Sequence, residues 1–268
     1  MSNKHQILFL SHGGGPMPLL NDENHLEMIA CLKDIAGTIK KPSAIIVVSA
    51  HWEEPVVSIT SSSRPELIYD YYGFPKETYE VTYPCPGLPS LAQSIHKTLN
   101  TSGIDAILDA KRGFDHGLFV PLKIMFPEAD IPCVQVSITN SLSPEAHLNL
   151  GKVLHDIDAD NLLIIGSGFS FHNMKAFFSP DSVETLALNA AFENWLMDTC
   201  TNHTISEAER EERLLKWETA PGARFCHPRE EHLLPLHVCY GAARAACSKH
   251  YELNILNKKC SMYFWDRD

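Results

Sequence analysis

Short runs of consecutive apolar residues recur along the first two thirds of the chain, and turn-forming residues bound each of them. The clearest runs are Ile7 to Leu10, Ala44 to Val48, Cys133 to Ile138 and Leu162 to Ile165. Their high content of Ile, Val and Leu predicts strands that are buried on both faces.

Longer segments between and after these runs repeat apolar residues every three or four positions, which is the spacing of one helix face. The predicted helices span His25 to Ile39, Leu88 to Leu99, Pro144 to Ile157, Ser182 to Thr201, Ser206 to Trp217 and Glu230 to Ala246. Alternating strands and helices favour an α/β fold, with a mostly parallel or mixed central sheet flanked by helices. We expect one domain over residues 1–268, with its active site at the carboxyl ends of the strands.

The segment Tyr69 to Pro89 combines many aromatic residues with several prolines. Prolines at this density prevent a long helix, so the segment is predicted to be an ordered loop. The loop either forms a wall of a binding pocket or simply packs over the sheet.

The composition, with 44% hydrophobic and 21% charged residues in 268, is that of an ordinary globular protein. A formal net charge of −11 disfavours nucleic-acid binding, which relies on clustered Lys and Arg. An anionic substrate would still find local positive charge at Lys111-Arg112 or between Arg224 and Arg229.

The eight cysteines are scattered, without a C-x-x-C pair, which is typical of free thiols in a reducing compartment. The segment Met1 to Gln6 leads into the first strand without an apolar signal core, and no apolar run reaches the ~20 residues of a membrane span. We therefore expect a cytoplasmic protein without a membrane partner, and an oligomer is compatible with the sequence.

Three histidines closely follow predicted strands, namely His12, His51 and His172. A fourth, His232, is predicted to open the helix that starts at Glu230. Carboxyl ends of parallel strands converge on one crevice, so these side chains are expected to meet there although they are far apart in sequence.

Neutral imidazole is a common ligand of Zn and Fe, and a catalytic metal site needs about three protein ligands with positions left open. His12, His51 and His232 match that number. His116 lies between Gly113 and Gly117, and it either approaches a ligand or is a loop histidine held by Asp115. The remaining histidines considered, which are predicted to be structural or on the surface, are His25, His96, His147, His155, His227 and His237.

The glycine-rich motifs SHGGGP and GSGFSF do not match nucleotide-binding fingerprints. Ser167, in Gly166-Ser167-Gly168, is not part of the G-x-S-x-G motif of esterases. The glycines are instead expected to let the backbone pass close to a metal or a substrate beside His12 and His172.

The motifs SHGGGP, SAHWE, YDYYGFP, YPCPG, FDHGLFVPL, GSGFSFHN and EEHLLPL occur in this order between His12 and about Gly241. Together they resemble the class III extradiol ring-cleavage dioxygenases, and most closely the DOPA 4,5-dioxygenase type. The resemblance implies a mononuclear non-heme Fe(II) site and the insertion of both atoms of O₂ into a catechol, giving a ring-opened semialdehyde.

Matched residue by residue, the resemblance implies that His12, His51 and His232 are metal ligands. His172 matches the acid/base histidine, which in this subgroup lies close enough to be counted as a ligand, and His116 matches a histidine near substrate and oxygen. The protocatechuate-type relatives have a carboxylate where His232 stands here. An all-histidine set suits Zn²⁺ as well as Fe(II), so both metals remain candidates.

For His172 we predict a base that takes a hydroxyl proton and later returns it, because an imidazole pKa of ~6.5 suits both directions. His116 would orient the substrate or stabilise bound oxygen. Two alternatives remain at this stage: a zinc-dependent hydrolase with His172 or Glu230 as base, and a binding protein of the same fold without catalytic activity.

Overall fold

The computed structural model describes residues 5–266, so residues 1–4 and 267–268, the two ends of the predicted domain, lie outside the described part. Its strands are β1 (Gln6–Ser11), β2 (Ala44–Glu54), β3 (Val57–Thr60), β4 (Ala106–Asp109), β5 (Cys133–Thr139), β6 (Leu162–Gly168), β7 (Lys249–Ile255) and β8 (Lys258–Trp265). They form one eight-stranded sheet in the order β4-β3-β5-β2-β6-β1-β8-β7. The four apolar runs of the sequence are its four central strands, β5, β2, β6 and β1.

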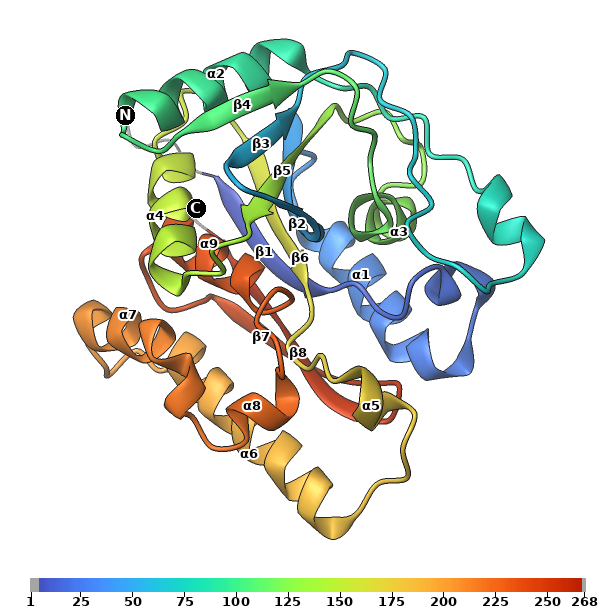
Figure 1. Cartoon of the computed structure of the whole chain (residues 1–268), viewed down its shortest axis with the longest axis vertical. Coiled ribbons are helices and arrows are strands. Elements are labelled where there is room, and N and C mark those ends of the chain that lie inside the picture. Colours follow the sequence, from blue (N-terminus) through green and yellow to red (C-terminus); the bar gives the residue numbers. More distant parts are fainter. Residues whose placement is uncertain (1–4, 267–268) are drawn as a thin grey trace.

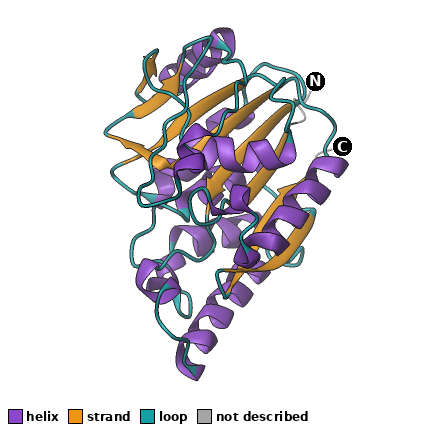
Figure 2. Cartoon of the chain, turned by 90° about the vertical axis from the view of Figure 1, so that its right-hand side faces the viewer, coloured by secondary structure: helices purple, strands orange, loops and turns teal. Residues whose placement is uncertain are grey.

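These central strands pair in parallel, whereas β8 joins β1, β7 joins β8 and β3 joins β5 in antiparallel fashion. The prediction of an α/β fold with a mixed, mostly parallel sheet is thus confirmed. The apolar runs are buried throughout, because helices cover both faces of the sheet (Figure 2). Because β1, β2 and β6 are parallel to one another, their carboxyl ends lie at the same edge of the sheet.

The helices are α1 (Leu26–Thr38), α2 (Pro89–Thr101), α3 (His116–Met125), α4 (Pro144–His155), α5 (Met174–Phe177), α6 (Val183–Thr201), α7 (Glu207–Leu215), α8 (Ala223–Cys226) and α9 (Leu234–Ala243). In Figure 1, α1 and α3 lie on one side of the sheet and α4 and α9 on the other. Side-chain caps begin several of them: Ser143 accepts a hydrogen bond from Ala146 N at the start of α4, and Ser182 from Thr185 N at the start of α6.

Several predicted helices are shorter than expected, and α3, α5 and α8 were not predicted. The helix predicted from Glu230 begins only at Leu234, so His232 lies in the turn before α9 and does not open it. α7 ends at Leu215 rather than at Trp217. His116 begins α3, which was missed because Gly117 and Pro121 disfavour a helix, although this one is buried almost completely.

No element was predicted for residues 249–265, which form the β7–β8 hairpin. Its two turn residues, Leu256 and Asn257, both have positive φ, of 52° and 60°. Hairpin turns of this kind usually carry Asn-Gly or Asp-Gly. This turn carries Leu-Asn instead, so the sequence lacks the common turn signal.

The segment Tyr69 to Pro89 is an ordered loop as predicted, apart from a short 3-10 helix at Lys76–Glu80. Phenol groups hold the loop together: the Tyr69 hydroxyl donates to Val81 O at 2.7 Å and the Tyr71 hydroxyl to Thr78 O at 2.6 Å. These bonds keep the aromatic rings at the strand ends, where the candidate site lies.

Candidate metal centre and active site

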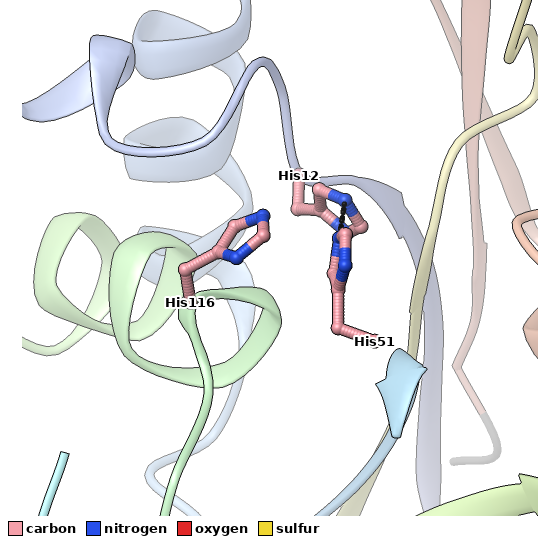
Figure 3. Close-up of side chains that lie close together, drawn as sticks. All are labelled: His12, His51 and His116. Atoms are coloured by element: carbon pink, nitrogen blue, oxygen red, sulfur yellow. Dashed lines mark hydrogen bonds between the residues drawn. The ribbon is translucent and has the colours of Figure 1, made fainter. Parts of the chain in front are cut away.

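His12 and His51 come from β1 and β2, the two strands that flank β6, and they meet at their Nε2 atoms, 2.9 Å apart (Figure 3). His12 is the first residue after β1. His51 belongs to β2, where the pairing with β5 is irregular between Ser49 and Glu53. Ser49 Oγ accepts a hydrogen bond from His51 N at 3.2 Å within this irregularity. A bulge of this kind redirects side chains, and here it turns His51 toward His12.

His232 reaches the same place from the turn before α9, and its Nε2 lies 3.4 Å from Nε2 of His51. The backbone beside it packs against the end of β6, where Phe169 N donates to His232 O at 2.9 Å. A Cβ at Gly168 would lie 2.1 Å from that carbonyl oxygen. Gly168 therefore lets two backbone segments approach closely, and this approach positions His232. It does not provide a direct contact with a metal or a substrate.

His116 and His172 flank this group. The His116 ring lies 3.9 Å from the His51 ring between centroids, and Figure 3 shows it pointing from the start of α3 toward the other two. The His172 ring stacks on His232 with centroids 3.4 Å apart and planes inclined by 15°. The five histidines singled out in the sequence thus border one cavity.

Hydrogen bonds on Nδ1 determine how the imidazoles present their other nitrogen. Ser167 Oγ donates its proton to Gly117 O at 2.5 Å and must therefore accept from His12 Nδ1, at 3.1 Å. His12 then carries its proton on Nδ1 and a lone pair on Nε2, which faces His51. Ser167 is thus a structural partner of His12, in agreement with its rejection as a nucleophile.

Two carboxylates contact the Nδ1 atoms of His116, His172 and His232. Asp70 Oδ1 accepts from His116 Nδ1 at 2.9 Å and from its backbone N at 3.0 Å. Glu231 Oε1 accepts from His232 Nδ1 at 2.9 Å and lies 3.1 Å from His172 Nδ1. A carboxylate can only accept these protons, so the Nε2 lone pairs of His116 and His232 remain available.

Both carboxylates are ionised partners of this site. Burial by itself raises the pKa of Asp70, but the hydrogen bonds and charge of His116 outweigh it and hold the pKa below its ordinary value. Burial likewise raises the pKa of Glu231, and the bond and charge of His172 lower it below its usual range. Two negative charges therefore lie behind the ring of imidazoles.

Sequence reasoning did not assign a role to either carboxylate. Both stand inside motifs that the sequence displays, Asp70 in YDYYGFP and Glu231 in EEHLLPL. Asp115, which sequence reasoning considered as the partner of His116, instead accepts from Ser49 Oγ at 2.8 Å and pairs with Arg112 at 3.2 Å. The reading of His116 as a loop histidine held by Asp115 was therefore wrong.

The pKa values of His12, His51 and His232 all lie well below the ordinary value of histidine. Burial is the largest cause for each, and the charges of the neighbouring histidines add to it. These imidazoles are consequently neutral at neutral pH, which is the form that binds metals.

Two of the distances between these nitrogens suit ligands of one ion. Ligand nitrogens about 2.1 Å from a common metal lie about 3.0 Å apart at right angles and about 3.4 Å apart at tetrahedral angles. The distances of His51 Nε2 to His12 Nε2 and to His232 Nε2, 2.9 and 3.4 Å, match these values. By donor type, protonation and spacing, the residues fit a metal ion.

Among residues 5–266, two groups of side chains have ligand atoms close enough to hold a metal ion: His12 with His51 and His116, and His172 with Glu231 and His232. His51 links them through its contact with His232. Glu231 faces the Nδ1 atoms of His172 and His232, on the far side of these rings from their Nε2 atoms.

Other histidines are structural, as predicted. His25, His147, His227 and His237 are buried. His25 Nε2 accepts from Gly14 N at 2.9 Å and its Nδ1 bonds Asp22 at 2.7 Å, which holds the glycine segment after His12 in place. His147 Nδ1 donates to Ser143 O at 2.7 Å and its Nε2 accepts from Thr139 N at 3.1 Å, at the end of β5.

The buried imidazole of His147 is expected to make folding sensitive to acid. Burial lowers its pKa to about 4, so below pH ~6.5 the unfolded chain binds a proton here that the folded chain does not. Stability should fall as the pH drops from 6.5 toward 4, by about 3 kcal/mol in all. Urea unfolding at pH 7 and pH 5 should show a loss that is about 2 kcal/mol smaller in His147→Gln. Equal losses in both proteins would contradict this assignment.

The cavity beside the histidines measures about 400 Å³, within the range of small-molecule sites. Gly13 to Gly15 form part of its wall, as expected, and Tyr71, Tyr72 and Phe74 from the aromatic loop form another part. The interpretation of that loop as a pocket wall is therefore confirmed, although its rings also pack on Phe119 of α3.

A family model described as the catalytic LigB subunit of aromatic ring-opening dioxygenase matches residues 6–264. "Dioxygenase tasH" of Hapsidospora irregularis is 37% identical, over 97% of this chain and 85% of its own. The 4,5-DOPA dioxygenase extradiol of Beta vulgaris is 38% identical, over 90% and 88%, and the Escherichia coli (strain K12) protein of the same name is 32% identical, over 90% and 86%.

Among solved structures, the uncharacterized protein JW3007 from Escherichia coli K12 superposes with a TM-score of 0.77 at 27% identity, covering 97% of this chain and 99% of that one. The likeness therefore extends over the whole sheet and the helices around it. Within residues 5–266, no helix has the length and apolar character needed to cross a membrane.

Proposed function

The chain belongs to the LigB family of class III extradiol dioxygenases, and we propose from this premise that it opens a catechol ring with a metal held by His12, His51 and His232. The observation that carries the proposal is the contact of His51 Nε2 with the Nε2 atoms of both His12 and His232, beside an open cavity. The reaction adds both atoms of O₂ to the diol and yields a ring-opened semialdehyde, so it needs no other oxidant or reductant. The partners are a small aromatic diol and O₂.

We propose Fe(II) as the working metal. When bound, it would supply the one-electron chemistry that lets O₂ react with a closed-shell aromatic ring, which Zn²⁺ does not offer. Zn²⁺ fits the same imidazoles and would then occupy the site without supporting turnover.

His172 is the proposed acid/base group. Its Nδ1 lies 3.1 Å from Glu231 Oε1, which orients the ring, and its side chain borders the cavity. A substrate hydroxyl in that cavity would give its proton to the free nitrogen of His172 and recover it when the ring opens. Stacked on His232, His172 also lies close enough to the ligand set to serve as a further ligand.

His116 is proposed to hold a substrate or oxygen atom. It is almost fully buried, and Asp70 fixes both its ring and its backbone N–H. The remaining nitrogen then has one direction in which to form a hydrogen bond, toward the cavity it borders.

The buried, unpaired state of all eight cysteines agrees with a reducing compartment, and we propose a cytoplasmic enzyme. The zinc hydrolase alternative has no support from the relatives, whose printed names describe dioxygenases. Glu230, its candidate base, pairs instead with Arg224 at 2.8 Å. All five matched histidines are present, which favours an enzyme over an inactive binding protein.

The test is anaerobic reconstitution of the metal-free protein with Fe(II), followed by a panel of catechols that includes DOPA, caffeate and protocatechuate. Oxygen uptake together with a yellow ring-opened product is expected for at least one of them. Protein loaded with Zn²⁺ is the control and should consume no oxygen. Product formation without oxygen would reject the proposal in favour of hydrolysis.

Glu231→Gln should weaken metal binding by about 10- to 100-fold, the usual effect of altering the partner of a metal-binding histidine. The amide still accepts a hydrogen bond, but it removes the negative charge that both His172 and His232 face. Glu230→Gln is the matched control, because its carboxylate pairs with Arg224 at the surface. Competition with a chelator measures both affinities, and equal affinities in the two variants would remove Glu231 from this role.

A further inference from the structure

The wall of the cavity beyond the histidines has a uniform chemistry. Apart from the five imidazoles and Gly13 to Gly15, every side chain that borders it within residues 5–266 is apolar or aromatic. These include Met17, Phe74, Phe177 and Leu256. The two hydroxyl groups of a catechol substrate would face the imidazoles, and a substituent on its ring would face apolar side chains.

The mouth of the cavity continues this apolar surface into solvent. Tyr72 is 91% exposed, Phe178 81% and Met174 54%, and all three border the cavity. Large apolar side chains gathered at the rim of a pocket offer surface that an apolar ligand can cover. Such a ligand would gain stability from each carbon atom that leaves water.

The arginine side chains nearest in sequence to His232 already pair with carboxylates of the protein itself. Arg229 pairs with Glu53 at 2.7 Å and with Glu231 at 3.4 Å. Arg224 pairs with Glu218 and Glu230, both at 2.8 Å.

Two further cations lie near the site without facing it. Arg112 is bound to Asp115, and Lys175, although it follows Met174, borders a separate cavity with Asp181. The basic stretches that the sequence offered for an anionic substrate are therefore absent from this pocket, as far as residues 5–266 define it.

The overall charge of the protein also disfavours an anion, since the chain carries a formal net charge of −11. A substrate carboxylate in the pocket would lose hydration and gain no cationic partner, which is unfavourable.

We infer that the aromatic diol taken by this site carries an uncharged, apolar substituent, such as an alkyl, alkenyl or aryl group, rather than a carboxylate or an amino-acid side chain. The inference rests on the proposed ring-opening function and narrows its substrate class. The substituent packs against apolar side chains of the cavity wall, among them Met17, Leu256 and Phe178.

A matched pair of compounds tests the inference: 4-butylcatechol and 3-(3,4-dihydroxyphenyl)propionate, which differ in carrying a terminal ethyl or a carboxylate. The iron-loaded enzyme should show a higher kcat/KM for the butyl compound. Across methyl, propyl and butyl catechols, anaerobic calorimetry should show affinity rising about three- to fourfold per added methylene, with an increasingly negative heat-capacity change. DOPA and protocatechuate serve as further catechols with charged substituents.

A charge placed at the rim should shift this preference. Phe178→Arg should lower the ratio of butyl to propionate kcat/KM by about fivefold. Ile107→Arg is the control, because it adds the same charge on β4, at the opposite edge of the sheet from the hairpin that carries Leu256, and should leave the ratio unchanged (Figure 1).

The outcomes separate the two proposals. If charged catechols are cleaved as well as or better than the alkyl ones, the inference on the substituent is overturned and ring opening stands. If no catechol is opened, the proposed function fails, and the affinities from anaerobic calorimetry still test whether the pocket prefers an apolar substituent. Tighter binding of alkylcatechols would then support the inference, and equal or weaker binding would overturn it.

Discussion

His232→Ala is expected to release the metal and to reduce ring cleavage by roughly 10⁴-fold, the scale seen when one member of a catalytic unit is removed. The Nε2 atom of the buried His232 imidazole lies 3.4 Å from His51 Nε2, within the proposed ligand set. Metal analysis of the purified variant measures the first effect and oxygen uptake with excess Fe(II) the second. His232→Gln, which retains more of the side-chain volume, serves if the alanine variant folds poorly.

The matched control is His116→Ala, which removes a ring of the same size from the same cavity. It should retain the metal, since His116 lies outside the proposed ligand set of His12, His51 and His232, and it should lose activity by a smaller factor. The opposite pattern, with metal lost in His116→Ala and retained in His232→Ala, would show that the ion lies among His12, His51 and His116.

His172→Ala is expected to keep the metal and to lose turnover by about 10²-fold or more, the usual contribution of an acid/base group. The pH dependence of kcat should also lose the limb that belongs to this group. The combination matters, because a residue that only packed against His232 would affect metal content and stability but not the shape of the pH profile.

Retained turnover in His172→Ala would reject the acid/base role. Loss of the metal together with activity would instead make His172 a ligand, in keeping with its stacking on His232 at 3.4 Å between ring centroids. Far-ultraviolet circular dichroism of both proteins provides the control for folding.

The sequence by itself determined the central strands and the residues at which the chemistry gathers. β1, β2, β5 and β6 were evident because strands buried on both faces are rich in Ile, Val and Leu, which local composition displays directly. His12 and His51 could be placed near each other because parallel strands share one edge. His232 was found by its motif, although the helix start assigned to it was four residues early.

Only the tertiary structure decided which groups stand behind the histidines and what lines the pocket. Asp70 and His116 are 46 residues apart, and Ser167 and His12 are 155 apart, so no local pattern links them. The β7–β8 hairpin that brings Leu256 to the cavity turns at residues without the usual glycine signal. Local periodicity reports which residues are buried, whereas proton direction, charge and pocket shape depend on contacts between distant segments, which folding alone creates.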